Sequence, residues 1–248
     1  MGPEIVALFN TFFHGNISAV ERMCLRSFVD FGHYINVFSY DKTVCPDYCN
    51  WMDARQIADV SDIYYYEDGP GKGSIAAFAN FFRYKLLQNF DGWWVDTDVI
   101  CLRADWPDGP FVAGWEDENF INNAVMKFEK NHSGLQEMID FCLQQKGRAE
   151  WGATGPQMLT EIYKKYNLLN YVKKFDCFYS INWSEADLFI KPEAKDDILT
   201  RTRESYAVHL YNEMFRRKGI DKNKIPPEKS FLWEVAYKHG VINFFNEI

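Results

Sequence analysis

The chain has 248 residues, of which 47% are hydrophobic and 17% aromatic, and this composition excludes a disordered chain and allows a full hydrophobic core. It has 27 Lys and Arg residues against 35 Asp and Glu residues, a formal net charge of −8 at pH 7. This charge argues against a nucleic-acid-binding protein, because neutralising phosphates requires clustered cations. A nucleotide held through a metal ion stays compatible with it.

The length and the lack of a Pro- or Gly-rich linker predict one domain over residues 1–248. The six cysteines are scattered, and Cys45 and Cys49 are the only close pair, so we expect free thiols in a reducing compartment and no zinc site. We see no signal peptide and no run of about 18 apolar residues. These features predict a cytoplasmic protein, with peripheral contact at a membrane as an alternative.

The first elements predicted are a strand, a helix and a strand. Residues 5–9 form a short apolar run typical of a strand. Ser18 and Glu21 have the spacing of a capping box for a helix that ends near residue 31, and residues 35–40 form a second strand. This order is the opening of a Rossmann-like α/β sheet.

Two segments of the first half, residues 10–16 and 44–53, are expected to be irregular. Apolar residues recur at helical spacing over residues 74–89 and predict a helix there. Asn80 and Arg83 lie three residues apart on that helix, so their side chains are neighbours on its surface.

The second half alternates predicted strands and helices. Strands are expected at residues 111–115 and 207–211, and helices at residues 133–146, 156–166 and 228–239. Pro156 is well placed to begin its helix.

A buried strand over Trp93–Val95 is predicted to end on two carboxylates, Asp96 and Asp98. Residues i and i+2 of an extended chain point to the same side, so we expect both carboxylates to aim at one place. Two like charges at one place favour a cation between them, and oxygen ligands suit Mg²⁺ or Mn²⁺. Taken alone, the pair is equally consistent with two solvated side chains at a strand end.

With these elements in order, the chain resembles sugar-nucleotide glycosyltransferases of the GT-A fold, in particular the DXD-containing family-32 and capsular-polysaccharide type. The core pattern of that group is a helix with a Ser/Asp/Asn-x-x-Arg-Tyr element, a turn with Gly, and an aromatic strand that runs into Asp-x-Asp. Here it stands as residues 78–87 and 91–98. Shorter motifs of the group follow in the expected order at residues 121–124, 154–156 and 207–212.

The chain departs from the pattern of the group at two positions. Asn80 stands where relatives often have Asp, and its amide can hydrogen-bond a ribose hydroxyl but carries no charge. Asp91 stands before Gly92 where relatives often have two glycines.

The resemblance implies an α/β protein with the GT-A, Rossmann-like mixed sheet flanked by helices and the Asp-x-Asp motif at a strand end. It implies a nucleotide-sugar half at about residues 1–115 and an acceptor half at about residues 116–248. The implied activity is metal-dependent transfer of a sugar from a nucleotide-sugar donor, with a UDP-sugar favoured over GDP-mannose. The acceptor would be a glycan, a lipid-linked saccharide or a protein, and the anomeric configuration would be retained.

The resemblance also assigns roles to single residues. Asp96 and Asp98 would hold Mn²⁺ or Mg²⁺ against the departing nucleoside diphosphate, with His209 as a further ligand. Arg83 would act with the two Asp residues in catalysis by contacting the donor sugar or phosphates. The other donor-binding residues expected are Phe9, Asn80 and Asn123.

Each of these roles has a plainer structural alternative. Arg83 could form an ion pair that holds its helix to the sheet, and His209 could be an ordinary, partly buried histidine. Asn123 could cap a turn. Gly155 and Pro156 could either shape the acceptor side or simply begin a helix.

Two charged segments are weaker candidates. Glu116 or Asp117 could line the donor pocket and stabilise an oxocarbenium-like centre. Five cations near the C-terminus could meet anionic lipids or a membrane surface, although a solvated loop is the plainer interpretation: Arg216, Arg217, Lys218, Lys222 and Lys224.

Two other functions stay open at this point. A haloacid-dehalogenase-type phosphatase also places Asp-x-Asp at a strand end, and Asp196 and Asp197 could imitate its later acidic motif. However, that motif has Thr or Val two residues after the second Asp, where this chain has Ile100. The non-enzymatic alternative is a degenerate transferase that serves as a carbohydrate-binding module.

Overall fold

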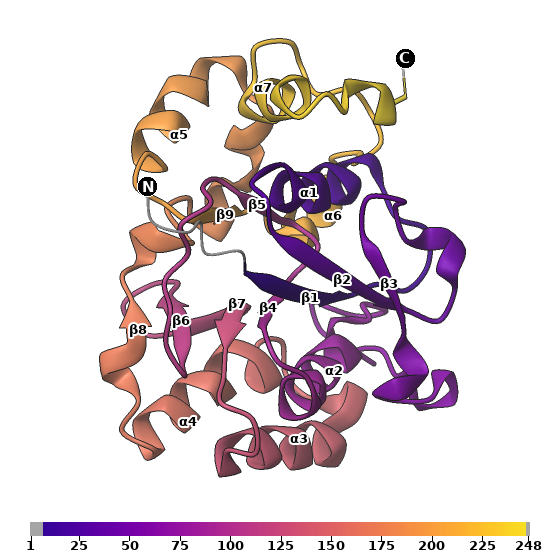
Figure 1. Cartoon of the computed structure of the whole chain (residues 1–248), viewed down its shortest axis with the longest axis vertical. Coiled ribbons are helices and arrows are strands. Elements are labelled where there is room, and N and C mark those ends of the chain that lie inside the picture. Colours follow the sequence, from indigo (N-terminus) through magenta and orange to yellow (C-terminus); the bar gives the residue numbers. More distant parts are fainter. Residues whose placement is uncertain (1–6, 247–248) are drawn as a thin grey trace.

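The computed structural model describes residues 7–246 and has an α/β architecture built on a seven-stranded sheet (Figure 1). The strands lie in the order β3-β2-β1-β4-β7-β6-β8. Their bounds are β1 Leu8–Phe12, β2 Tyr34–Ser39, β3 Asn50–Asp53, β4 Trp93–Val95, β6 Val112–Trp115, β7 Ile121–Lys127 and β8 Val172–Lys173. Two further strands, β5 Val99–Cys101 and β9 Ala207–His209, form a small sheet of their own.

The direction of the strands makes this a mixed sheet, as predicted. Strands β3, β2, β1 and β4 are parallel, β7 is antiparallel to both β4 and β6, and β8 is parallel to β6. The carboxyl ends of β1, β4, β6 and β8 therefore lie at one edge of the sheet. Strands β2 and β3 extend from one side of β1, and β4 lies on its other side, so the strand order reverses between β1 and β4. In open α/β sheets, ligands bind in the crevice at the carboxyl end of the strands where the order reverses.

Helices cover both faces of the sheet (Figure 1). Helix α1 and the C-terminal helices lie on one side together with β5 and β9, and α2, α3 and α4 lie on the other. The bounds are α1 Ala19–Asp30, α2 Ala76–Asn89, α3 Ser133–Gln145, α4 Met158–Lys165, α5 Lys195–Arg201, α6 Asn212–Arg217 and α7 Phe231–Lys238.

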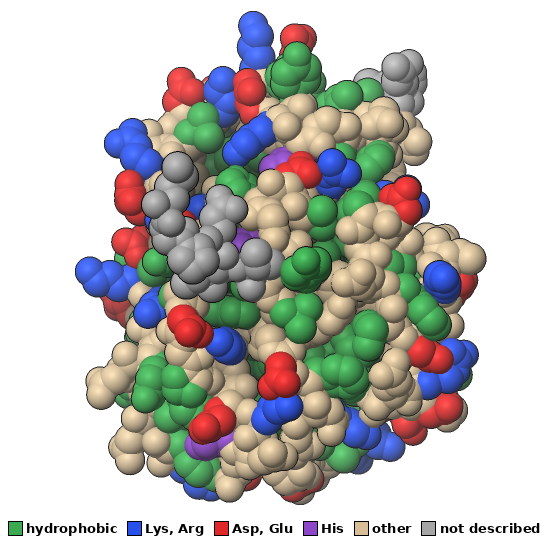
Figure 2. Space-filling model, viewed as in Figure 1, with side chains coloured by type: hydrophobic (Ala, Val, Ile, Leu, Met, Phe, Trp, Pro, Cys, Tyr) green, Lys and Arg blue, Asp and Glu red, His purple; other side chains and the backbone are tan. Residues whose placement is uncertain are grey.

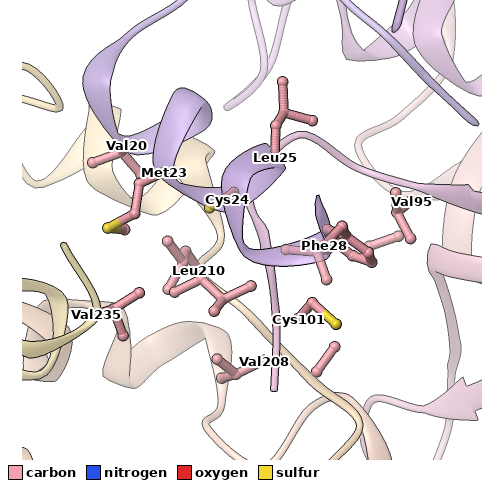
Figure 3. Packing of buried hydrophobic residues seen from close by; sticks show 14 of the residues in the cluster. Val20, Met23, Cys24, Leu25, Phe28, Val95, Cys101, Val208, Leu210 and Val235 are labelled. Atoms are coloured by element: carbon pink, nitrogen blue, oxygen red, sulfur yellow. The ribbon is translucent and has the colours of Figure 1, made fainter. Parts of the chain in front are cut away.

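Each face of the sheet has its own hydrophobic core. On the α1 side, Cys24 and Phe28 pack with Leu210 and Cys101, as Figure 3 shows, and all four are at most 1% exposed. On the α2 side the core includes Phe82 and other aromatic residues that are buried on the face opposite α1. Burying such side chains stabilises the fold by about 1.5–3 kcal/mol each relative to exposure.

The structure corrects the predicted first strand. Of the predicted residues 5–9, residues 5 and 6 lie outside the described part, and β1 continues through Asn10–Phe12, which we expected in a loop. Asn10 is fully buried, and its amide donates to the carbonyl oxygens of Asp91 and Trp93 at 3.0 and 3.2 Å. A polar side chain with satisfied bonds in the sheet gives no hydrophobic signal in the sequence.

Strands β3 and β7 were also missed. Strand β3 lies in the predicted irregular segment 44–53, and all four of its residues are partly or fully exposed. Strand β7 contains Asn122 and Asn123, which interrupt its hydrophobic pattern although both are buried. Helix α4 begins at Met158, two residues after the predicted start, because residues 153–157 form an irregular turn in which Gly155 is non-helical.

Within residues 7–246, no helix combines the length and the apolar character needed to cross a membrane.

The capping box of α1 is formed as predicted and provides a test of the fold. The backbone N–H of Ser18 donates to Glu21 at 2.7 Å, and the N–H of Glu21 donates to the Ser18 hydroxyl at 3.4 Å. We expect Ser18→Ala to lower the free energy of unfolding by about 1 kcal/mol in urea titrations, because it removes this cap. Ser18→Thr keeps the hydroxyl and should lose much less; equal losses would contradict the role of the cap.

Candidate active site

Asp96 and Asp98 lie where β4 ends, but not on an extended strand. Residues 97 and 98 form a turn between β4 and β5, in which the N–H of Val99 donates to the Asp96 carbonyl at 3.3 Å. The predicted position at a strand end is therefore confirmed. The alternation of an extended chain is the wrong reason for the convergence of the two carboxylates, because the turn brings them together.

The pairing of β5 with β9 places His209 beside this turn. His209 lies directly opposite Val99 in the small antiparallel sheet. Its neighbours in the chain, Val208 and Leu210, are fully buried in the α1-side core. Because side chains alternate along a strand, His209 points away from that core. Its Nε2 lies 3.3 Å from Asp98 Oδ1.

Asp96, Asp98 and His209 together can offer three ligand atoms that all lie within 4.8 Å of one another. Two oxygen donors and one imidazole suit Mn²⁺ and also accept Mg²⁺. In residues 7–246 this is the only group of three or more His, Cys, Asp or Glu side chains with such geometry. The structure thus brings together the three metal ligands that the resemblance implies.

Asp98 is held by neighbours that favour its charged form. The backbone N–H of Asn212 donates to Asp98 Oδ2 at 2.7 Å, and the N–H of Leu210 donates to the Asp98 carbonyl at 2.9 Å. Burial alone would raise the pKa of Asp98, but His209 and the Asn212 N–H lower this pKa to about 2. The carboxylate therefore stays ionised and available to a cation at neutral pH.

Asp96 is oriented from the other side by α2 and β4. Its Oδ1 accepts hydrogen bonds from Arg83 Nη2 at 2.6 Å and from Trp94 Nε1 at 2.7 Å. Burial raises the pKa of Asp96, and Asp98 adds to the rise while Arg83 opposes it. A cation between the two Asp side chains would relieve their repulsion.

Arg83 serves in this structure as a positioning residue. It is 4% exposed, it donates to Asn80 Oδ1 at 3.1 Å as well as to Asp96, and its guanidinium lies 4.9 Å from the centre of a Trp94 ring. This is the ion pair between helix and sheet that we considered as the plainer alternative. A direct contact of Arg83 with a donor stays a prediction.

Asn80 and Asn123 belong to a buried amide network next to Arg83. Asn123 Nδ2 donates to Asn80 Oδ1 and to the Tyr84 hydroxyl, both at 3.0 Å, and Asn80 Nδ2 donates to Thr154 at 3.1 Å. A Cβ on Gly155 would lie 3.3 Å from Asn123 Oδ1, so only glycine lets this backbone approach the amides without displacing them. Their role in donor binding stays a prediction.

Several polar atoms around this region have no hydrogen-bond partner. Six buried side-chain atoms of the described residues are unpartnered, and only that of Tyr163 lies elsewhere. The other five belong to Thr11, Arg83, His209, Tyr211 and Asn212. Such groups are rare in proteins because each costs about 1–3 kcal/mol, so their concentration here indicates a ligand site.

Three of these residues, Thr11, Tyr211 and Asn212, were not predicted as site residues. Tyr211 lies between His209 and Asn212 with φ 58° and ψ 63°, and its ring centre is 4.1 Å from that of His209. A bulky residue with positive φ is strained, and such strain is concentrated at functional sites. Thr11 is fully buried near the carboxyl end of β1. Tyr211 and Asn212 lie in the motif at residues 207–212, which brought them close to His209 without assigning them a role, whereas Thr11 carried no sequence signal.

Phe9 does not lie at the site, contrary to prediction. It is fully buried on the α1 side, and its ring centre is 4.7 Å from that of Phe28 and 4.6 Å from that of Trp106. A donor cannot reach it in this arrangement. The resemblance implied a donor-binding role for Phe9, whereas its side chain packs in the core.

Four of the five C-terminal cations, all except Lys224, are engaged in ion pairs and so do not form a free basic patch. Arg216 and Arg217 both pair with Glu213, at 2.6 and 2.8 Å. Lys218 pairs with Asp187, and Lys222 pairs with Glu21. On the face that Figure 2 shows, basic and acidic side chains are interspersed. This arrangement agrees with the plainer interpretation of a solvated segment.

Comparisons with known proteins indicate the class of protein to which this fold and this site are similar. A family model described as the alpha 1,4-glycosyltransferase conserved region matches residues 127–232. The solved structure of the glycosyltransferase GlyE from Streptococcus pneumoniae aligns with 96% of this chain and 62% of its own, with a TM-score of 0.50 and 15% sequence identity. Together they support a glycosyltransferase of the GT-A type.

Individual curated proteins also match part of the chain. The chain is 30% identical over 146 residues to human lactosylceramide 4-alpha-galactosyltransferase and 28% identical over 143 residues to the rat protein of that name. It is 26% identical over 145 residues to human alpha-1,4-N-acetylglucosaminyltransferase. Each match covers 53% of this chain, and the matched region spans only 39–41% of the length of these relatives.

The buried pair of Arg83 and Asp96 yields a test of positioning. We expect Arg83→Lys to lower the free energy of unfolding by about 1–3 kcal/mol, because lysine cannot reproduce the fork that contacts both Asp96 and Asn80. Urea unfolding monitored by tryptophan fluorescence measures this.

Arg55→Lys is the matched control, because its pair with Asp53 at 3.2 Å is exposed and should contribute less than about 0.5 kcal/mol. Unchanged stability of Arg83→Lys, together with reduced turnover, would instead assign Arg83 a direct contact with substrate.

Proposed function

We propose that this chain is a metal-dependent hexosyltransferase that moves a sugar from a UDP-sugar to a glycan acceptor. The observation that carries the proposal is the convergence of Asp96, Asp98 and His209 among unpartnered buried polar atoms at the carboxyl edge of the sheet. The names of the curated relatives support a galactose or N-acetylglucosamine donor and a glycolipid or other glycan as acceptor. Transfer of this kind belongs to polysaccharide or glycolipid biosynthesis.

In this proposal Asp96, Asp98 and His209 hold Mn²⁺ or Mg²⁺. When bound, the ion supplies positive charge that stabilises the nucleoside diphosphate as a leaving group. Arg83 holds Asp96 in its orientation, and the Asn212 N–H holds Asp98. Both carboxylates are thus in place before the substrate arrives, and preorganised charge of this kind is an effective contribution to catalysis.

The donor nucleotide would lie in the crevice between β1 and β4. The reversal of strand order there supports this position, and so does the unpartnered hydroxyl of Thr11 on β1. Asn80 and Asn123 offer amide groups for the hydroxyls of the donor sugar. Residues 1–115 would then supply most of the donor site, and residues 116–248 would supply His209 and the acceptor site.

We infer retention of anomeric configuration from the names of the relatives. These names specify α-linked products, and the sugars of UDP-galactose and UDP-N-acetylglucosamine are α-linked as well. A chain that shares both donor and product linkage retains the configuration of the donor.

The two alternative functions have less support. Asp196 and Asp197, which would complete a phosphatase site, lie on α5, and the cluster around Asp96 contains His209 instead. A carbohydrate-binding module without activity has no need for the buried, strained and unpartnered groups of this site.

Metal dependence is the central test of the proposed function. We expect release of UDP from UDP-galactose or UDP-N-acetylglucosamine to require Mn²⁺ or Mg²⁺ and to stop in EDTA. Asp98→Asn should lower turnover at least 100-fold without unfolding the protein, because it removes a charge from the metal ligand set.

Asp91→Asn is the matched control, since Asp91 precedes the opposite end of β4, is exposed and pairs only with Lys130 among the described residues. Full activity in EDTA would refute the proposed metal dependence. Phosphate release from small phosphomonoesters would favour the phosphatase instead.

The ligand role of His209 can be tested without turnover. We expect His209→Ala to weaken Mn²⁺ binding about 10-fold or more in titration calorimetry, which corresponds to about 1.4 kcal/mol. His239→Ala is the control, because that imidazole pairs with Asp30 at 2.8 Å on the α1 side, outside the metal-ligand group. Equal Mn²⁺ affinity of the two variants would exclude His209 as a ligand.

A further inference from the structure

A hollow that is separate from the metal-ligand group lies at the same edge of the sheet. It has a volume of about 450 Å³, within the range of small-molecule sites, and it is lined where β6 and β8 end. Trp115 ends β6, Glu116 follows it, and Phe175 lies two residues after β8. Tyr179 closes the inner wall. Nothing in the proposed donor site uses this hollow.

We propose that this hollow is the acceptor subsite and that it takes an uncharged saccharide, with Phe175 and Trp115 as apolar platforms and Glu116 as a hydrogen-bond acceptor for sugar hydroxyls. This inference rests on the proposed function and extends it to the second substrate.

The position of the hollow fits an acceptor. Strand β6 lies two places from β4 in the sheet, so their axes are about 10 Å apart. This leaves room for one transferred sugar between the metal-ligand group and the hollow. Tyr179 belongs to both regions, because it lines the hollow and its ring centre is 6.0 Å from that of His209. The hollow and the metal-ligand group therefore adjoin each other through this one ring.

The side chains of the hollow suit a saccharide. Phe175 is 56% exposed although aromatic, and it has no partner that covers it among the described residues. Flat aromatic faces pack against the C–H face of a pyranose ring, and carboxylate oxygens accept hydrogen bonds from its hydroxyls. Glu116 is half-buried and makes no ion pair within the described chain.

The charge of the hollow selects against anionic acceptors. The lining contains three consecutive carboxylates, Glu116, Asp117 and Glu118, against two cations, Lys174 and Arg201, so negative charge predominates. The positive charge of Arg201 is already engaged, because it pairs with Glu185 at 2.7 Å and with Asp197 at 3.3 Å. A second carboxylate or a phosphate on the acceptor would meet repulsion there, whereas a neutral sugar would not.

Saccharide binding provides the test, and it does not need turnover. Methyl β-galactoside and methyl β-galacturonide differ by one carboxylate, and their binding to the protein loaded with UDP and Mn²⁺ is measured by saturation-transfer NMR. We expect the neutral galactoside to bind at least 10-fold more tightly. Phe175→Ala should weaken its binding at least 5-fold, and Glu116→Gln should reduce the discrimination against the galacturonide.

The matched control is Tyr34→Ala, because Tyr34 is 62% exposed and lies at the opposite, amino end of β2. This variant should bind both saccharides like the wild-type protein. All variants should bind UDP unchanged. Equal galactoside binding by Phe175→Ala and wild type, tighter binding of the galacturonide, or no saccharide binding at all would overturn the subsite. Failure of UDP release from UDP-sugars would instead contradict the proposed transferase activity.

Discussion

The pairing of β5 with β9 is the contact on which the rest of the site depends. It joins two segments that are more than a hundred residues apart and sets His209 opposite Val99, next to Asp98. The same connection continues through the N–H groups of Leu210 and Asn212, which hold the backbone and the carboxylate of Asp98. Asp98 and His209 are therefore held next to each other by backbone contacts, as their proposed role in binding a cation requires.

This unit is anchored from both sides of the sheet. On the α1 side, Glu21 accepts from Asn212 Nδ2 at 2.9 Å and from the Ser18 N–H, so the helix cap and the site share one carboxylate. On the α2 side, Arg83 links Asp96 to the buried amides of Asn80 and Asn123. Buried polar networks are stable only when their members are satisfied, and the atoms left unsatisfied here lie where a ligand would bind.

In the proposed function, the sheet edge separates the sites of the two substrates. The crevice between β1 and β4 lies on one side of the Asp96 turn, and the hollow at the ends of β6 and β8 lies on the other. A transfer reaction needs two binding sites that meet at one reacting centre, and parallel strands supply this because their carboxyl ends share an edge. The rings of Tyr179 and Tyr211 both lie next to that of His209.

The sequence by itself determined the elements with strong local signals. The capping box of α1, the helix over residues 76–89 and the aromatic strand that ends at Asp96 are formed as predicted, because periodicity, caps and β-branched or aromatic runs act over a few residues. The order of the motifs, by resemblance to glycosyltransferases, also identified Asp96, Asp98 and His209 as one group.

Only the tertiary structure decided how these residues are used. The tertiary structure places Phe9 in the core and pairs Arg83 with Asp96, since burial and ion pairing depend on which segments of the chain meet. Asn10 and Asn123 are strand residues rather than loop residues, because the amide of Asn10 finds partners beside the neighbouring strand β4 and that of Asn123 finds partners on helix α2. The strain at Tyr211 and the hollow beside Glu116 could not be predicted from the motifs that contain these residues, because both arise from contacts between residues far apart in the chain.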